Sequence, residues 1–181
     1  MSPRTKGLVR RSTSGRGGDS VEIRTYVDGD LGRMTEIWND VVRAGNAFPQ
    51  ASEMSVDQAR EFFADQTRCA VAIDAGAVVG LYILHPHGVG RCAHTANASY
   101  AVDSSARGNG LGRALVQDSL DHLAECGFRG LQFNAVVASN FAAIRLYESL
   151  GFDRVGIIPG GYLNTVGEYE DTIIYHHAVP V

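Results

Sequence analysis

YAVDSSARGNGLG, residues 100–112, joins the end of an apolar, strand-like run to the start of a long, helix-like segment. Its glycines, Gly108, Gly110 and Gly112, stand at every second position where that helix would begin. Glycine leaves backbone amides without a covering Cβ, and the first amides of a helix have no intrahelical partner. Because these amides also carry the positive end of the helix dipole, the stretch predicts a phosphate-binding turn. An ordinary glycine-rich connection is the simpler alternative.

The composition is typical of one globular domain. The chain has 181 residues, of which 45% are hydrophobic and 20% are charged, so it has enough apolar material for a core. A net charge of −4 argues against a general nucleic-acid binder. No apolar run reaches the roughly 18 residues that a membrane span needs. Three scattered cysteines, Cys69, Cys92 and Cys126, are typical of a reducing compartment. We therefore expect a cytoplasmic protein without a membrane partner.

The first twenty residues differ from the rest. Residues 1–20 hold five basic residues against one acidic residue, Asp19, and are rich in glycine and serine. They lack the apolar centre of a secretory signal. This pattern predicts a disordered basic tail in front of one domain over residues 21–181. A tail that docks on nucleic acid or ribosomes is the alternative.

The remaining chain alternates between strand and helix patterns. Apolar alternation and turn signals predict strands at 21–27, 69–73, 77–84, 94–102, 131–137, 152–158 and 171–177. Helical spacing and capping signals predict helices at 31–44, 55–63, 110–126 and 140–150. A mobile loop is expected to start at residue 159, PGGY. The order β, α, α, β, β, β, α, β, α, β, β indicates one mixed α/β domain.

Two histidines flank a proline in residues 85–88, HPHG. Paired histidines can ligate a metal, but nothing nearby supplies a third ligand at a usual spacing. We therefore expect a polar turn that closes the preceding hairpin, and no metal.

Two motifs together resemble the GNAT superfamily of N-acetyltransferases. Residues 107–112, RGNGLG, match its R/Q-x-x-G-x-G/A signature, and residues 140–152, NFAAIRLYESLGF, are similar to its N-x-x-A-x-x-L-Y-x-x-x-G-F motif. The resemblance covers all but the basic tail. It implies a single GNAT-like α/β domain, with a mixed central sheet splayed after the fourth strand and about four flanking helices. It also implies transfer of an acetyl group from acetyl-CoA to a primary amine of a small molecule or peptide, by direct attack in a ternary complex.

The resemblance also implies roles for individual residues. Backbone groups of Ala101 and Val102 would meet the pantetheine arm of the cofactor, which Asn140 would also contact. Tyr147 would protonate the departing CoA thiolate, although a packing role on an amphipathic helix is the alternative. The pyrophosphate would lie on the glycine turn. Arg107 would shape this turn. The turn residues of this set are Arg107, Gly108, Asn109, Gly110, Leu111, Gly112 and Arg113.

A dinucleotide-binding site is the main competitor for the glycine turn. It needs the pattern G-x-G-x-x-G, whereas here the glycines fall as G-x-G-x-G. Counted from Gly110, Leu115 stands at the place of the third glycine. The spacing therefore favours acetyl-CoA over a dinucleotide.

The acceptor amine must lose a proton before it attacks, because an alkyl ammonium has a pKa of about 10. The fourth predicted strand, HTANASYAV, has no acidic residue that could take this proton. His94, Glu168 and Glu53 are the candidate bases, with transfer to solvent as the further alternative. The missing acid also leaves a non-catalytic acyl-CoA sensor or interaction module as an alternative function.

The acceptor pocket is predicted from side chains near the same strand. Phe48, Asn97, Ser99 and Asn134 are its candidate residues, while Asn134 could instead pair with Asn97 or Ser99 across the sheet. The pattern does not identify the acceptor. A homodimer is compatible with a small domain that has sheet edges.

Overall fold

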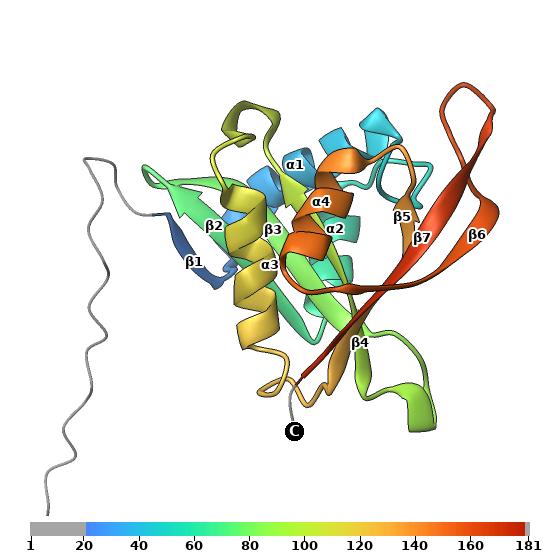
Figure 1. Cartoon of the computed structure of the whole chain (residues 1–181). Helices are drawn as coiled ribbons and strands as arrows, with labels where there is room; N and C mark the ends of the chain where they lie inside the picture. Colours follow the sequence, from blue (N-terminus) through green and yellow to red (C-terminus); the bar gives the residue numbers. More distant parts are fainter. Residues whose placement is uncertain (1–20, 180–181) are drawn as a thin grey trace, which may run out of the picture.

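The computed structural model describes residues 21–179 (Figure 1), so the predicted basic tail lies outside the described residues. None of the helices in residues 21–179 is long and apolar enough to cross a membrane. The elements follow the predicted order, with three short 3-10 turns between them. They are β1 (Glu22–Thr25), α1 (Leu31–Ala44), α2 (Val56–Ala64), β2 (Arg68–Asp74), β3 (Ala77–Pro86), β4 (Thr95–Val102), α3 (Leu111–Asp121), β5 (Gly130–Val137), α4 (Phe141–Ser149), β6 (Asp153–Leu163) and β7 (Tyr169–Ala178).

The strands form one seven-stranded sheet in the order β1-β2-β3-β4-β5-β7-β6. All neighbours are antiparallel except β4 and β5. These two strands pair only at Thr95↔Gly130 and Ala96↔Leu131. This confirms the mixed sheet that is splayed after its fourth strand. From residue 97 onward, the edge of β4 that faces β5 therefore has no strand partner within residues 21–179.

Two helices cover each face of the sheet, which accounts for the four predicted flanking helices. In Figure 1, α3 and α4 lie in front of the sheet and α1 and α2 lie behind it. Leu81 of β3 packs with Trp38 of α1 and Phe63 of α2, in one core cluster. The next residue, Tyr82, packs with Leu115 of α3 in the second cluster. Alternate side chains of a strand point to opposite faces, so the central strands are buried on both sides.

The local signals for three helix ends are confirmed. The amide of Ser55 donates to Gln58 Oε1 at 2.9 Å, and the amide of Gln58 donates to Ser55 Oγ at 3.3 Å, which completes a capping box. Asn140 Oδ1 accepts from the amide of Ala143 at 3.2 Å, at the start of α4. Gly45 ends α1 with a φ of 57°, a left-handed conformation that glycine adopts without strain.

The mobile loop predicted from residue 159 is wrong. The PGGY segment continues β6 to Leu163, with an irregular register between Ile158 and Tyr162. Because β6 is an edge strand, a proline there needs no ladder partner. A Cβ on Gly161 would lie close to the side chain of Thr172, so glycine allows β7 to approach.

Several predicted element ends also shift. The first strand is shorter than residues 21–27, and α3 ends at Asp121 rather than at residue 126. Beyond α3 the backbone forms a hydrogen bond of the 3-10 type, because the amide of Leu123 donates to the carbonyl of Leu120, three residues earlier. β3 runs through Pro86, so the HPHG segment begins inside a strand and not in a turn. His85 therefore pairs with Asn97 of β4.

Candidate functional site

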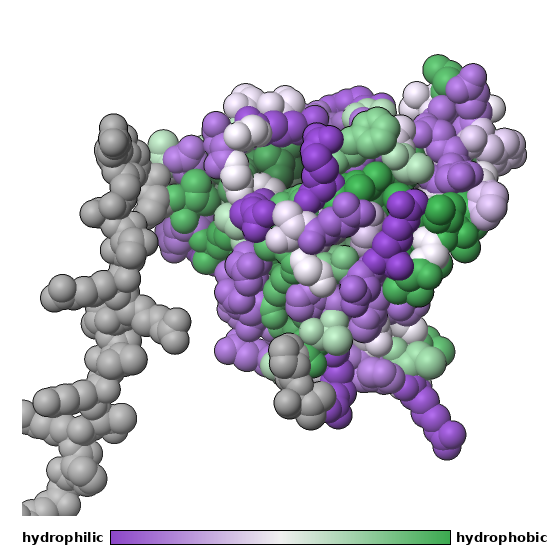
Figure 2. Space-filling view, viewed as in Figure 1, coloured by the Kyte–Doolittle hydropathy of each residue, from purple (hydrophilic) through white to green (hydrophobic). Residues whose placement is uncertain are grey.

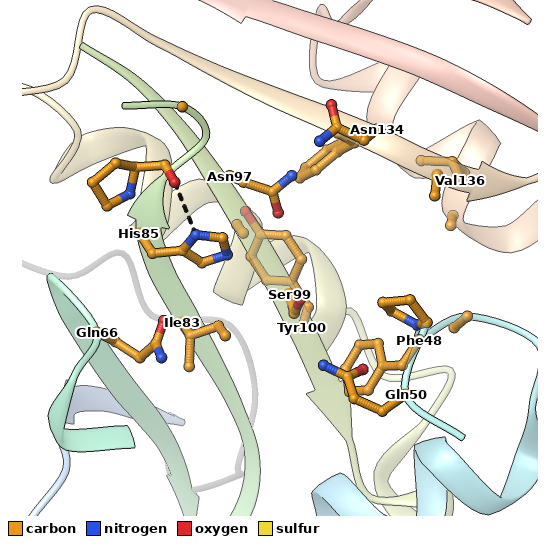
Figure 3. Close-up of a pocket in the computed structure, with 18 of the residues that line it drawn as sticks. Phe48, Gln50, Gln66, Ile83, His85, Asn97, Ser99, Tyr100, Asn134 and Val136 are labelled. Carbon is orange, nitrogen blue, oxygen red and sulfur yellow. Dashed lines mark hydrogen bonds between the residues drawn. The ribbon is translucent and has the colours of Figure 1, made fainter. Parts of the chain in front are cut away.

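A cleft of about 970 Å³ opens where β4 and β5 separate (Figure 3). Phe48 comes to it from the connection between α1 and α2, and Ser99 comes from β4. Phe133 of β5 and Tyr147 of α4 line the same cleft from the other face of the sheet. The splay therefore joins the two faces in one cavity, which an unbroken ladder would close.

The predicted acceptor-pocket residues all line this cleft: Phe48, Asn97, Ser99 and Asn134. The ring of Phe48 is buried against Trp38, with 4.4 Å between ring centroids. The hydroxyl of Tyr162 donates to the carbonyl of Phe48 at 3.0 Å. The long β6 therefore braces the loop that forms one wall of the cleft.

Asn134 does not pair with Asn97 or Ser99, so that alternative is wrong. Its Nδ2 lies 3.0 Å from Nδ1 of His87, and its Oδ1 accepts from Gln132 Nε2 at 3.0 Å. These contacts tie the end of β3 to β5 beside the cleft. Among residues 21–179, no group of three or more His, Cys, Asp or Glu side chains could hold a metal ion.

Tyr147 both packs against the core and lines the cleft. Its ring packs on Phe133, with 4.3 Å between centroids, and its side chain lines the cleft. Residues 21–179 provide no hydrogen-bond partner for its hydroxyl. Burial raises the pKa of Tyr147 well above that of a free phenol, because the dry surroundings disfavour the phenolate. The hydroxyl is therefore protonated at neutral pH. Asn140 lines the same side of the cleft.

The glycine turn lies at the N-terminus of α3, outside the lining of the cleft. Gly108 and Gly110 have φ values of 85° and 80°, in the left-handed region. No atom lies within 4 Å of the position that a Cβ would take on either residue. The first intrahelical bond runs from the amide of Ala114 to the carbonyl of Gly110. The amides of residues 111–113 are therefore available to a ligand in this open space.

Two arginines connect this turn to its neighbours. Arg107 Nε donates to the carbonyl of Val102 at 3.4 Å, so the turn folds back on the end of β4. Arg113 donates to the hydroxyl of Ser149, which joins α3 to α4. In Figure 1 the N-terminal ends of α3 and α4 lie toward the same edge of the molecule.

Asp103 is a site residue that sequence reasoning missed. It is 7% exposed and lies between β4 and the turn. Its Oδ1 accepts from the amide of Ser105 at 2.7 Å and from the hydroxyl of Ser105 at 2.6 Å. Its Oδ2 accepts from the guanidinium of Arg33 on α1. The local signal was the D-S-S sequence, in which an aspartate caps the amide two residues on.

None of the three predicted bases lines the cleft. His94 is exposed just before β4, and its Nδ1 lies 2.9 Å from the carbonyl of Arg91. Glu53 is exposed and pairs with Arg43 at 2.5 Å. Glu168 is exposed in the turn between β6 and β7, where its amide donates to Asn164. The geometry therefore does not support these three residues as the base.

Residues 34–152 match the acetyltransferase (GNAT) family, and this span includes both motifs. The chain belongs to the GNAT acetyltransferase family. It is an N-acetyltransferase. N-acetyltransferase aca1 of Schizosaccharomyces pombe is 30% identical over 168 residues, which cover 83% of this chain and 80% of that protein. A GCN5-related N-acetyltransferase from Kribbella flavida, of known structure, has 35% identity and a TM-score of 0.81, covering 88% of this chain and 98% of that one.

Two further proteins are similar to this chain. The [ribosomal protein bS18]-alanine N-acetyltransferase of Escherichia coli is 46% identical over 81 residues, which cover 45% of this chain and 52% of that enzyme. The putative acetyltransferase yncA from Salmonella typhimurium was solved with its cofactor acetyl-CoA. It shares the fold, with a TM-score of 0.84 at 23% identity, covering 90% of this chain and 95% of that one. Membership in this family supports acetyl transfer from acetyl-CoA.

Replacing Asp103 with Ala is expected to lower the free energy of unfolding by about 2 kcal/mol, because Arg33 and the amide of Ser105 lose a buried partner. Acetyl-CoA affinity should fall about fivefold or more as the turn loosens, a loss of about 1 kcal/mol. Chemical denaturation and calorimetry measure the two effects. Glu36→Ala is the matched control, because it removes only the exposed ion pair of Arg33. Equal effects of the two variants would contradict the anchoring role of Asp103.

Proposed function

We propose that the chain transfers an acetyl group from acetyl-CoA to a primary amine of a small molecule or peptide, by direct attack in a ternary complex. The observation that carries this proposal is the single cleft at the splay of β4 and β5. It holds Tyr147 and Asn140 on one side and the predicted acceptor residues Phe48 and Ser99 on the other. Both substrates can therefore meet in one cavity, so that the amine attacks the thioester without a covalent enzyme intermediate.

The donor would occupy the side formed by α3, α4 and the free edge of β4. Its pyrophosphate would rest on the amides of residues 109–113, where the helix dipole attracts negative charge. Arg107, which shapes the turn, would add positive charge beside it. The pantetheine amides would pair with the backbone of Ala101 and Val102, since this edge of β4 has no partner in β5. The side chain of Asn140 would contact the same arm.

Tyr147 would act as the general acid. A departing CoA thiolate needs a proton, and the hydroxyl of Tyr147 lines the cleft without another partner in residues 21–179. Its raised pKa keeps the proton on the phenol until the C–S bond breaks. The packing of its ring on Phe133 holds the hydroxyl in one direction, which limits the entropy lost on reaching the transition state.

The acceptor would enter between Phe48 and the β3–β4 face. The walls there are mostly apolar, and Asp65 is the carboxylate among the lining residues. A carboxylate attracts an ammonium group, and apolar walls favour an amine with a partly apolar body. Phenylethylamine, spermidine and an alanyl peptide amide sample these properties.

Turnover with this amine panel tests the proposed function. Purified protein is mixed with acetyl-CoA and each amine, CoA release is followed with a thiol reagent, and the acetylated product is identified by mass spectrometry. At least one amine should gain an acetyl group at a rate that saturates with both substrates. Tight acetyl-CoA binding without any acetylated amine would contradict the proposal.

We also propose that the enzyme works in the cytoplasm. All three cysteines are free: Cys69 is buried, Cys126 is half-buried and Cys92 is exposed. An exposed thiol persists in a reducing compartment, whereas an oxidising one favours disulfides. Localisation of a tagged full-length chain by cell fractionation tests this assignment.

A homodimer through β6 is the oligomeric state that we propose. β6 is an edge strand and exposes Val155, Ile157 and Ile158, at 63%, 48% and 46% of their surface. Figure 2 shows hydrophobic side chains over β6 on the right of the molecule. Exposed apolar side chains on an unpaired strand favour association.

Ile157→Lys should therefore convert a dimer at micromolar concentration into a monomer, as measured by light scattering after gel filtration. A lysine at this position would place a charge in an apolar interface. In a symmetric dimer the partner would add a second, equal charge. Val27→Lys, an exposed valine beside the opposite edge strand, is the matched control and should leave the mass unchanged. A wild-type chain that runs as a monomer would exclude the dimer.

A further inference from the structure

The reaction needs a base for the acceptor amine, and the three predicted bases lie outside the cleft. β4 carries no acidic residue that could serve in their place. Apart from tyrosines, the titratable side chains among the cleft-lining residues are Asp65 and His85. Asp65 is exposed at the C-terminal end of α2. His85 is half-buried within the sheet, so the two candidates differ in their surroundings.

The register of β3 and β4 places His85 beside the acceptor pocket. His85 is paired with Asn97, and Ile83 is paired with Ser99. Side chains of paired residues stand on the same face of a sheet, with Cβ atoms about 5 Å apart. His85 therefore stands next to Asn97, on the face that also carries Ser99. His85, Asn97 and Ser99 all line the cleft, as does Phe48 from the connection between α1 and α2.

One hydrogen bond determines which nitrogen of His85 is free. Nδ1 lies 3.0 Å from the carbonyl oxygen of Pro86, the contact drawn as a dashed line in Figure 3. A carbonyl can only accept, so Nδ1 carries the proton and donates it. In the neutral ring, Nε2 then holds the lone pair. Residues 21–179 provide no partner for Nε2, and in Figure 3 this nitrogen faces the side of the cleft where Ser99 lies.

We propose that Nε2 of His85 is the general base that takes the proton of the acceptor amine. Imidazole accepts and releases protons near neutral pH, which suits this role, and the carbonyl of Pro86 holds the ring in the required tautomer. His85 is thus assigned a catalytic role that rests on the proposed direct attack in the ternary complex. Asn97, its neighbour across the strands, would orient the amine or a bridging water.

The proton and electron balance of the step is complete. The ammonium gives one proton to Nε2, and the lone pair that remains on nitrogen forms the C–N bond with the thioester carbon. The C–S bond breaks, its electron pair goes to sulfur, and sulfur takes the proton of Tyr147. A second proton leaves the new amide nitrogen and restores the phenol, directly or through water. The imidazolium then releases its proton to solvent, so the net products are the amide, CoA and one proton.

A pair of acceptors that differ in basicity tests this role. Phenylethylamine is protonated at neutral pH, whereas its β,β-difluoro analogue is far less basic because the fluorines withdraw electrons. His85→Gln should lower kcat with phenylethylamine by about 100-fold, since general-base catalysis typically contributes that much. The loss should be much smaller with the fluorinated amine, which needs less help to lose its proton. The KM for acetyl-CoA should change little, because His85 lies on the acceptor side.

His94→Gln is the matched control, because His94 also has its Nδ1 near a backbone carbonyl but is exposed outside the cleft. It should retain wild-type rates with both amines. Asp65→Asn tests the other titratable group. It should raise the KM for phenylethylamine, because the ammonium loses a carboxylate partner, but its effect on kcat should not depend on the basicity of the acceptor. A second measurement does not depend on turnover: nitrogen-15 NMR of the histidines should show the Nδ1–H tautomer for His85 in the neutral form of the ring.

Three results would overturn the assignment of His85. One is an equal loss of kcat for both amines in His85→Gln, which indicates a structural role. Another is a loss of kcat that depends on acceptor basicity in Asp65→Asn or His94→Gln and not in His85→Gln. The third is an Nε2–H tautomer for neutral His85. In each case wild-type turnover remains, whereas failure of the proposed function would remove turnover from the wild-type enzyme itself.

Discussion

Tyr147→Phe is expected to lower kcat by about 100-fold or more while leaving the affinity for acetyl-CoA within about twofold of wild type. The substitution removes one hydroxyl that lines the cleft and keeps the ring that packs on Phe133 and Phe152. Steady-state kinetics with a reactive amine and calorimetry with acetyl-CoA measure the two quantities separately. The split between turnover and binding is the signature of a group that acts in the transition state.

Tyr175→Phe provides the control for loss of a tyrosine hydroxyl. The hydroxyl of Tyr175 donates to Glu148 Oε1 at 2.9 Å, and its residue does not line the cleft. This variant should lose about 1 kcal/mol of stability and keep its turnover. Full activity of Tyr147→Phe would contradict the role of Tyr147 as the general acid. A protein that only senses acyl-CoA would bind it equally well in both variants and acetylate nothing.

Gly110→Ala should weaken acetyl-CoA binding by about tenfold or more. Gly110 has a φ of 80°, and an alanine in the left-handed region costs about 1–2 kcal/mol. Part of this cost is relieved if the turn shifts, which would move the amides of residues 111–113. If the turn does not shift, the new Cβ enters the open space beside those amides. Either response opposes a pyrophosphate at the start of α3.

Gly127→Ala separates strain from ligand binding. Gly127 has a φ of 81°, and its Cβ would also meet nothing within 4 Å. It follows α3 at the other end of the helix and should lose about the same stability as Gly110→Ala. Its acetyl-CoA affinity should remain that of the wild type, as measured by calorimetry. Equal affinities in the two variants would place the pyrophosphate away from the turn.

The parts of the fold that could be predicted from sequence depend on neighbouring residues. The capping box of Ser55 and Gln58, the cap of Asn140 and the left-handed Gly45 each arise within a few residues along the chain. The glycine turn and the residues around Tyr147 were located because their spacing matches two motifs of a known family. These signals were enough to indicate the splayed sheet and four of the residues that line the cleft.

The errors occurred where pairing with another strand decides the position of a residue. The PGGY segment suggests a loop, but pairing with β7 keeps it in β6. The HPHG segment suggests a turn, but pairing with β4 extends β3 to Pro86 and places His85 in the cleft. Asn134 finds His87 across the sheet rather than Asn97. Register and tertiary contacts decide these positions, and a single sequence does not contain them in a local pattern.

A crystal structure of the enzyme with acetyl-CoA is the most direct test of the account. The pyrophosphate should accept hydrogen bonds from the amides of residues 109–113, and the pantetheine arm should run along Ala101 and Val102 between β4 and β5. The sulfur should lie within hydrogen-bond distance of the Tyr147 hydroxyl, with His85 facing the thioester from the acceptor side. Acetyl-CoA bound away from the turn, or a sulfur outside the reach of Tyr147, would contradict the proposed site.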